Sequence, residues 1–268
     1  MRFFSVLQVL KIDSDNKEKL IDTIKSDIVR HVFAFYDVQH EPEKTTVYAA
    51  FDGDALKGYI LIYSGLESPS IILECQQDSA EKLLGYALKN NFVMHTPPDI
   101  LPTIQKRFPD AKHYSEDWML VKKGDAKSFP SEAVRRLLTA KDAADFAALL
   151  STRDDRPAIS PEKCMSFIGK LPTFGVFVHG ELVSYAGSFI QLSQVWMIGG
   201  VYTHPSHRNR GYATLATSAI TEEALKNADS AALFVRSDNY PAVKVYESIG
   251  YRKIGEKLWV DVGTGLRP

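Results

Sequence analysis

The sequence predicts a mixed α/β (α+β) chain made of two similar halves, each a mixed, mostly antiparallel β-sheet flanked by helices. In both 51–63 and 177–189 a glycine turn separates two strand-like runs, as in a β-hairpin. In both 111–121 and 251–262 a pair of strands that ends in a tryptophan-bearing run is expected after a short helix. A chance resemblance between two α/β halves is the alternative, because short strand patterns recur often.

The spacing of these landmarks shows where the halves differ. The hairpin glycines Gly53 and Gly180 are 127 positions apart, whereas Glu116 and Glu256 are 140 apart. The second half therefore has additional residues between its hairpin and its end, and a basic loop with a glycine falls there.

The stretch 122–133 mixes Lys, Gly, Ser and Pro without periodicity, which is typical of a linker. It predicts two domains, at 1–124 and 133–268. The chain of 268 residues, 45% of them hydrophobic, is long enough for two cores.

Local signals predict the elements of the second half in the order βααβββαβαβ. Thr139 is expected to cap the first helix, Ser160 and Pro161 to start the second, and Gly250 to end the last. The predicted strands are 133–138, the hairpin at 174–190, 195–204, 230–237 and those within 251–262, and the predicted helices are 140–151, 161–170, 212–227 and 241–250.

Composition restricts the function classes. The formal net charge of −1 disfavours nucleic acid or an anionic membrane as the main partner. The chain has no apolar run of about 20 residues and no signal-peptide pattern, so a cytoplasmic protein is expected. Cys75 and Cys164 are far apart and lack partners at metal-ligand spacing, which favours free thiols and no metal.

The stretch "HPSHRNRGYATLATSAITEEAL" (204–225) places Arg208, Arg210 and Gly211 where a strand meets a helix. The free N–H groups of a helix start and its dipole attract anions. Gly211 and the small Ala213 leave room for a phosphate to approach. The alternative is a solvated surface loop at an ordinary helix start.

This loop and the segment "NYPAVKVYESIGY" (239–251) together resemble the GNAT N-acetyltransferase superfamily. The loop matches its R/Q-x-x-G-x-G/A motif and the segment matches N-x-x-A-x-x-x-Y-x-x-x-G-[FY], in the right order. The resemblance covers about 133–262. A tandem layout with one degenerate half adds a weaker similarity to the FR47-like relatives of glycine N-acyltransferases.

The resemblance implies a site for acetyl-coenzyme A or another acyl-coenzyme A. The backbones of Val201 and Thr203 would pair with the pantetheine arm, and Asn239 would lie near the cofactor. Tyr246 would be the general acid, and Lys244 is a weak candidate for the adenine end. The coenzyme pyrophosphate would lie on the loop residues Arg208, Asn209, Arg210, Gly211, Tyr212 and Ala213.

Acyl transfer to an amine needs a neutral amine and a proton for the leaving thiolate. A free alkylamine has a pKa near ~10.4 and a thiol near ~8.5, so a phenol of pKa ~10 is a plausible donor to the thiolate. A core tyrosine is the alternative for Tyr246. Many family members carry a glutamate base on the strand before the loop, but this strand, "VWMIGGVYTH", has no carboxylate. His204 or an ordered water remains for that role.

Two further features concern the amine. Gly199 and Gly200 predict either a bulge that opens the strand to a thioester or close packing against bulky neighbours. The loop 151–160 is expected to face this opening. Its charged residues either recognise the amine or are merely solvated: Arg153, Asp154, Asp155 and Arg156.

The predicted function is transfer of an acetyl or short acyl group to a primary amine, with a small molecule or an amino acid as acceptor. Two alternatives remain open: an acyl-coenzyme A sensor without turnover, and an acetyltransferase acting on protein lysines or N-termini. No metal or redox cofactor is implied by any spacing in the sequence.

The first half is predicted to keep the architecture without the cofactor site. Its counterpart of the loop, "CQQDSA" (75–80), has no glycine and no basic residue. Asp78 or Ser79 is expected to cap the helix, and a carboxylate there would repel a pyrophosphate. The later stretch 96–111 has no tyrosine in the place of Tyr246.

Overall fold

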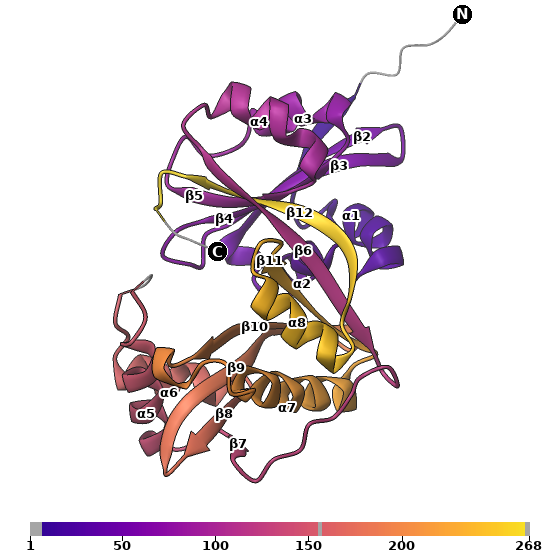
Figure 1. The fold of residues 1–268 in the computed structure, drawn as a ribbon. Helices are drawn as coiled ribbons and strands as arrows, with labels where there is room; N and C mark the ends of the chain where they lie inside the picture. Colours follow the sequence, from indigo (N-terminus) through magenta and orange to yellow (C-terminus); the bar gives the residue numbers. More distant parts are fainter. Residues whose placement is uncertain (1–6, 155–156, 266–268) are drawn as a thin grey trace, which may run out of the picture. The chain divides into compact units, whose positions relative to one another are not determined.

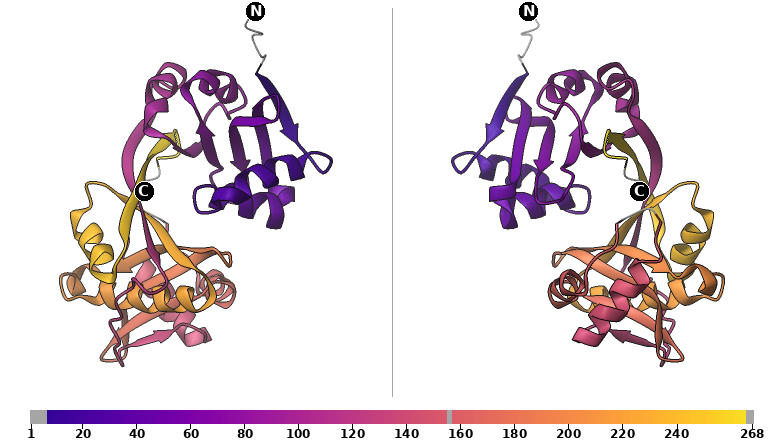
Figure 2. Two further views of the ribbon diagram at one scale, coloured as in Figure 1. Left: turned by 90° about the vertical axis from the view of Figure 1, so that its right-hand side faces the viewer. Right: turned by 90° about the vertical axis from the view of Figure 1, so that its left-hand side faces the viewer.

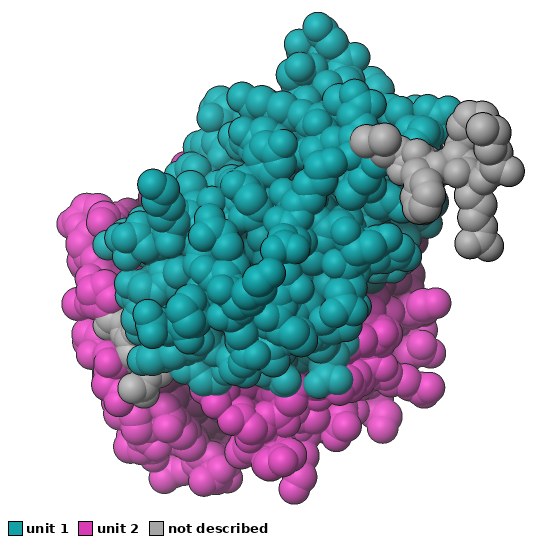
Figure 3. Space-filling view, turned by 90° about the horizontal axis from the view of Figure 1, so that it is seen from above, with its two compact units in different colours: residues 1–116, 256–268 teal, residues 117–255 magenta. Residues whose placement is uncertain are grey.

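The computed structural model describes residues 7–154 and 157–265, and the chain divides into two compact units (Figure 3). Unit 1 comprises residues 1–116 and 256–268, and unit 2 comprises residues 117–255. The chain leaves unit 1 within strand β6 (Lys112–Lys122) and returns to it within strand β12 (Arg252–Val262).

This division differs from the predicted domains 1–124 and 133–268. The physical reason lies in β12, whose residues Leu258–Val262 pair with Phe92–Thr96 of strand β5. The end of the chain therefore completes the sheet of unit 1, which a boundary drawn from linker composition does not capture.

Within the described residues the order βααβββαβαβ occurs twice, as shown in Figure 1. This confirms the order predicted for the second half and the shared architecture predicted for the first. The first series is β1 (Gln8–Ile12), α1 (Lys17–Ile24), α2 (Val32–His40), β2 (Thr45–Asp52), β3 (Ala55–Tyr63), β4 (Ser70–Cys75), α3 (Gln77–Leu84), β5 (Phe92–Thr96), α4 (Leu101–Arg107) and β6. The second is β7 (Val134–Arg136), α5 (Ala140–Leu150), α6 (Pro161–Lys170), β8 (Thr173–Val178), β9 (Glu181–Gln191), β10 (Val195–Thr203), α7 (Tyr212–Asn227), β11 (Ser230–Arg236), α8 (Tyr240–Ile249) and β12.

Each sheet is mixed and mostly antiparallel, as predicted. Unit 1 has the strand order β1-β2-β3-β4-β5-β12, and unit 2 has β6-β11-β10-β9-β8-β7. The parallel pairs are β4 with β5 and β10 with β11, and each of them extends over three residue pairs. Beyond those pairs the two parallel strands are not hydrogen-bonded to each other.

Helices pack on both faces of each sheet (Figure 2). In unit 1, α1 and α2 pack against one face through residues such as Leu20 and Val38, and α3 and α4 pack against the other through Leu83 and Ile104. In unit 2, α5 and α6 cover one face, and α7 and α8 cover the other. Because both faces of each sheet are covered, successive residues of a strand are buried toward opposite layers, as Ile60 and Leu61 of β3 are.

Several local signals act as predicted. Thr139 and Asp142 form a reciprocal capping box at α5, and the Ser160 side chain caps α6. Gly250 ends α8 with a φ of 111°. The strand pairs predicted within 111–121 and 251–262 are wrong, because each segment forms one continuous strand, β6 or β12.

Candidate functional site

The loop between β10 and α7 presents unpaired backbone donors. Two of its residues, Asn209 (φ 61°) and Gly211 (φ 80°), have left-handed conformations. In the part of the chain that the structure describes, the N–H groups of residues 209–214 donate no hydrogen bond. Because the start of the 16-residue helix α7 also carries partial positive charge, these donors can bind an anion together.

The space beside Gly211 is open. A Cβ atom added there would meet no heavy atom within 4 Å, so the glycine is not needed to avoid a clash inside the protein. Its φ of 80° is nevertheless a conformation that other L-residues adopt only at a cost. The loop therefore combines a glycine-dependent turn with free space for a ligand.

The two arginines of the loop are placed differently. Nε of Arg208 donates a hydrogen bond of 3.3 Å to the carbonyl of Thr203, and its guanidinium carbon lies 5.8 Å from the ring centre of Tyr202. Arg210 is exposed. Tyr212 and Ala213 are half-buried in the first turn of α7. Either arginine can turn toward an anion held by the loop.

Strand β10 separates from its neighbours just before this loop. It pairs with β11 only at Val195–Met197, and its register with β9 slips between Gly199 and Tyr202. Gly200 has a φ of 68° within this bulge. The bulge, one of the two interpretations of these glycines, is confirmed, and among the described residues one edge of β10 has no strand partner beyond Met197.

The glycines of the bulge also allow close packing. A Cβ atom at Gly199 would lie 2.8 Å from the Phe189 ring, and one at Gly200 would lie 3.1 Å from the Tyr185 ring. Both interpretations made from the sequence therefore hold, because the strand bends at the point where two aromatic rings take the space of a side chain.

The free edge of β10 carries the backbone groups of Val201 and Thr203. The N–H of His204 donates to the carbonyl of Val183 on β9 at 2.8 Å, and the carbonyl of Tyr202 accepts from the side-chain hydroxyl of Ser184, also on β9, at 3.0 Å. Since backbone groups alternate between the two edges of a strand, those of Val201 and Thr203 point away from β9. This edge can pair with an extended ligand.

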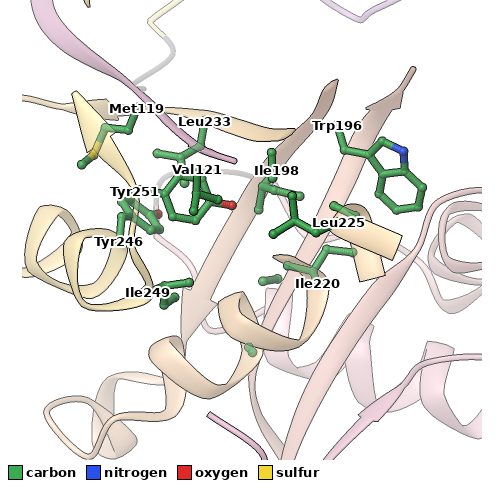
Figure 4. Close-up of a cluster of buried hydrophobic side chains, with 14 of the residues drawn as sticks. Met119, Val121, Trp196, Ile198, Ile220, Leu225, Leu233, Tyr246, Ile249 and Tyr251 are labelled. Carbon is green, nitrogen blue, oxygen red and sulfur yellow. The ribbon is translucent and has the colours of Figure 1, made fainter. Parts of the chain in front are cut away.

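Tyr246 lies on α8 within the core cluster of unit 2, next to Tyr251 (Figure 4). It is 7% exposed, and burial raises the pKa of its phenol to about 12. The Tyr251 hydroxyl is hydrogen-bonded to Thr221 at 2.8 Å, but among the described residues the Tyr246 hydroxyl has no partner. Tyr246 is thus a core tyrosine, and its hydroxyl makes no hydrogen bond to the described residues.

Asn239 caps α8, because its Oδ1 accepts from the N–H of Ala242 at 3.4 Å. This cap does not use the Nδ2 group of Asn239, which is exposed. Lys244 is also exposed, on the same helix.

His204 is occupied within its own turn. Its Nδ1 accepts from the N–H of Ser206 at 3.2 Å and lies 2.8 Å from the Ser206 hydroxyl. The nitrogen that carries the lone pair is therefore already hydrogen-bonded within this turn.

The loop after α5 reaches the end of β10. The guanidinium carbon of Arg153 lies 5.1 Å from the ring centre of Tyr202, while Asp154 is exposed. Asp155 and Arg156, also named as candidates for recognising the amine, lie outside the described residues. Of the two candidate residues that the structure describes, Arg153 lies beside β10.

The corresponding loop of unit 1 is built differently. Gln76 stands at the start of α3 without a side-chain cap, so the prediction that Asp78 or Ser79 caps this helix is wrong. The Ser79 hydroxyl instead donates to the carbonyls of Gln76 (3.0 Å) and Lys57 (3.3 Å), because it is buried against β3. Asp78 is exposed in the first turn, where its charge disfavours an anion.

Unit 1 has an ion triad at the position where unit 2 has the β10 bulge: Glu74 and Lys257 are buried, and Arg30 is partly exposed. The last parallel pairs are made by Ile72 in β4 and Met197 in β10, and two residues later stand Glu74 and Gly199. Glu74 accepts from Arg30 (2.9 and 2.6 Å) and from Lys257 of β12. Although burial raises the pKa of the Glu74 carboxyl, the charges and hydrogen bonds of Lys257 and Arg30 outweigh it and hold this pKa below its ordinary value.

Other features bear on cofactors and location. Cys75 and Cys164 are buried free thiols, as predicted. Across residues 7–154 and 157–265, no group of three or more His, Cys, Asp and Glu side chains is arranged to hold a metal ion. No helix in these ranges has the length and apolar character needed to cross a membrane.

Comparison with known families matches residues 174–260 to the FR47-like proteins. No curated protein matches the chain. Among similar solved structures, a Drosophila protein is 16% identical, with a TM-score of 0.71 and coverage of 97% of this chain and 99% of that one.

Two further structures carry descriptive names. A GCN5-related N-acetyltransferase from Sphaerobacter thermophilus is 9% identical, with a TM-score of 0.66 and coverage of 97% and 98%. A tandem GNAT protein from the clavulanic acid biosynthesis pathway is 13% identical, with a TM-score of 0.56 and coverage of 96% and 98%. At these identities the similarity establishes the fold.

Proposed function

Because residues 174–260 are FR47-like and the chain has the tandem GNAT fold, we propose that unit 2 transfers an acetyl or short acyl group from acyl-coenzyme A to a primary amine. One observation carries this proposal: the free N–H groups at the start of α7 adjoin a strand, β10, with an unpaired edge. The first feature suits a diphosphate and the second an extended amide chain, and coenzyme A contains both.

The cofactor would be held by groups already described. The N–H groups of residues 209–214 would bind the diphosphate, and Arg208 and Arg210 would add charge-assisted hydrogen bonds. Val201 and Thr203 would pair with the pantetheine arm. Since Arg208 now donates to the carbonyl of Thr203, it would leave that carbonyl for the diphosphate. Asn239 would donate from its Nδ2 group.

Bound acyl-coenzyme A would supply the thioester carbon that the amine attacks. As the new C–N bond forms and the C–S bond breaks, Tyr246 would give its proton to the departing thiolate. The amine loses one proton to solvent, and solvent returns one proton to the phenolate of Tyr246. No side chain is assigned as the base, because β10 has no carboxylate and Nδ1 of His204 is occupied.

We propose a small amine or an amino acid as acceptor. The position of Arg153 beside Tyr202 supports an acceptor that carries a negative charge. The absence of a carboxylate from β10 favours a second candidate, an acyl-coenzyme A sensor without turnover. Thiol release from acetyl-coenzyme A, measured with a panel of amines, amino acids and peptides, separates the two. Release with no member of the panel, together with tight binding of coenzyme A, would favour the sensor.

The anion loop gives a direct test. Gly211→Val should weaken coenzyme A binding at least about tenfold, or ~1.4 kcal/mol, because it strains a left-handed turn and places methyl groups beside the diphosphate. Isothermal calorimetry measures this. Gly180→Val is the matched control: its φ of 85° and open surroundings are similar, but it lies in the β8–β9 turn. Equal affinities in the two folded variants would contradict the assignment.

Binding stoichiometry tests the role of unit 1. One equivalent of coenzyme A per chain is expected, because the α3 loop has no glycine or arginine and Glu74 and Lys257 occupy the place of the β10 bulge. Calorimetric titration gives the number directly. A second equivalent that disappears on substitution within residues 75–82 would show that unit 1 retains a site.

A further inference from the structure

Tyr202 lies between the two residues expected to pair with the pantetheine arm, but its side chain faces the other layer. It packs against the cluster formed by α5 and α6, whereas Val201 packs in the cluster of α7 and α8. Tyr202 therefore connects the proposed cofactor strand to the α5–α6 side of unit 2.

The Tyr202 hydroxyl holds the start of the loop after α5. It donates to the carbonyl of Thr152 at 3.1 Å and lies 2.9 Å from the hydroxyl of the same residue. The Thr152 hydroxyl gives its own proton to Leu149 at 2.7 Å, so toward Tyr202 it can only accept. Both contacts therefore draw on one tyrosine proton.

Two cations lie near the Tyr202 ring. The guanidinium carbon of Arg153, the residue after Thr152, is 5.1 Å from the ring centre, and that of Arg208 in the anion loop is 5.8 Å away. Both distances lie within the range of cation–π attraction. One side chain thus contacts the loop after α5 and the loop before α7.

We propose that Tyr202 is a positioning residue: its hydroxyl fixes Thr152 and Arg153 at the end of β10, so that the amine meets a preformed wall beside the thioester. This inference rests on the proposed function. The Tyr202 hydroxyl is expected to affect the affinity for the acceptor amine. The ring is expected, in addition, to hold Arg208 and so to affect the affinity for coenzyme A.

The test compares Tyr202→Phe, which keeps the ring, with Tyr202→Leu, which removes it. For Tyr202→Phe the KM for the best amine of the panel should rise about 3- to 10-fold, the range of one lost hydrogen bond. Its kcat and coenzyme A affinity should stay within about twofold. Tyr202→Leu should weaken coenzyme A binding as well. Tyr240→Phe, at a residue that is 68% exposed, is the matched control and should change none of these quantities.

A second variant checks the partner. Thr152→Val removes the hydroxyl but keeps the carbonyl, so it should also raise the KM for the amine. In the double variant, Tyr202→Phe should raise this KM by a smaller factor than it does in the parent. A fall in kcat with unchanged KM in Tyr202→Phe, or fully additive effects, would overturn the proposal.

Limited trypsin digestion separates failure of this inference from failure of the proposed function, because it needs no activity. Release of the peptide that ends at Arg153 should be several-fold faster in Tyr202→Phe than in the parent and in Tyr240→Phe. If no amine releases thiol but this difference is found, the Tyr202 hydroxyl still fixes Thr152 and Arg153, whereas the acyltransferase proposal fails. Equal cleavage rates would overturn the positioning role.

Discussion

Tyr246→Phe is expected to lower kcat by about 10²-fold or more, the range of general acid catalysis, while coenzyme A affinity stays nearly intact. The substitution removes one hydroxyl that has no hydrogen-bond partner among the described residues. The free energy of unfolding should therefore change by less than about 1 kcal/mol. Thiol release at saturating substrates measures the effect.

Tyr251→Phe is the matched control for this prediction. Its hydroxyl is bonded to Thr221 in the same core, so its loss should reduce stability by about 1 kcal/mol without lowering kcat. Equal kcat values for Tyr246→Phe and the parent would contradict the role of Tyr246 as general acid and leave it a structural role in the core.

The pH dependence provides a second check on Tyr246. Burial raises the pKa of its phenol to about 12, so the proton to be donated is present across the whole neutral and mildly alkaline range. A decrease in kcat caused by loss of this acid should appear only near that pKa. A falling limb between about pH 8 and 9 would point to a different acid, with a pKa nearer that of a free thiol.

Lys257→Met is expected to lower the free energy of unfolding of unit 1 by about 3 kcal/mol. Removing one partner of a buried ion pair costs about 3–5 kcal/mol, and the lower end applies because Arg30 still neutralises Glu74. The Lys257 and Glu74 side chains are 11% and 6% exposed, so water cannot replace the lost charge easily. Urea unfolding followed by circular dichroism measures the change.

Two variants control for this effect. Lys253→Met breaks a pair with Asp117 of 2.8 Å, but Lys253 is 47% exposed, so less than about 1 kcal/mol should be lost. The double variant Glu74→Leu with Lys257→Met leaves no buried charge and should recover most of the stability. A loss in Lys257→Met no larger than in Lys253→Met would show that the triad contributes little.

The stability lost in Lys257→Met is expected to depend on pH. Because the pKa of Glu74 is lowered in the folded protein, its ion pairs contribute fully above the ordinary carboxyl pKa of ~4.3. That contribution is lost as pH falls through the lower folded value. The stability difference between the parent and Lys257→Met should therefore shrink in acid.

Local patterns in the sequence determined the order of elements in both halves and the loop at the start of α7. Hairpin turns at Gly53 and Gly180, the cap at Thr139 and the helix end at Gly250 depend on neighbouring residues, so they can be recognised without knowing the fold. The bulge near Gly200 was one of the two interpretations of these glycines, because a glycine within a strand pattern indicates either a local distortion or close packing.

Tertiary structure alone decided which distant residues meet. Lys257 reaches Glu74 across 183 positions because β12 completes the sheet of unit 1, and the linker composition at 122–133 contains no signal for that pairing. The contact of Tyr202 with Thr152, 50 positions away, likewise depends on how α5 packs on the sheet. Strand pairing and helix packing are set by the burial of whole faces, whereas turns and caps are set by the backbone conformations of a few adjacent residues.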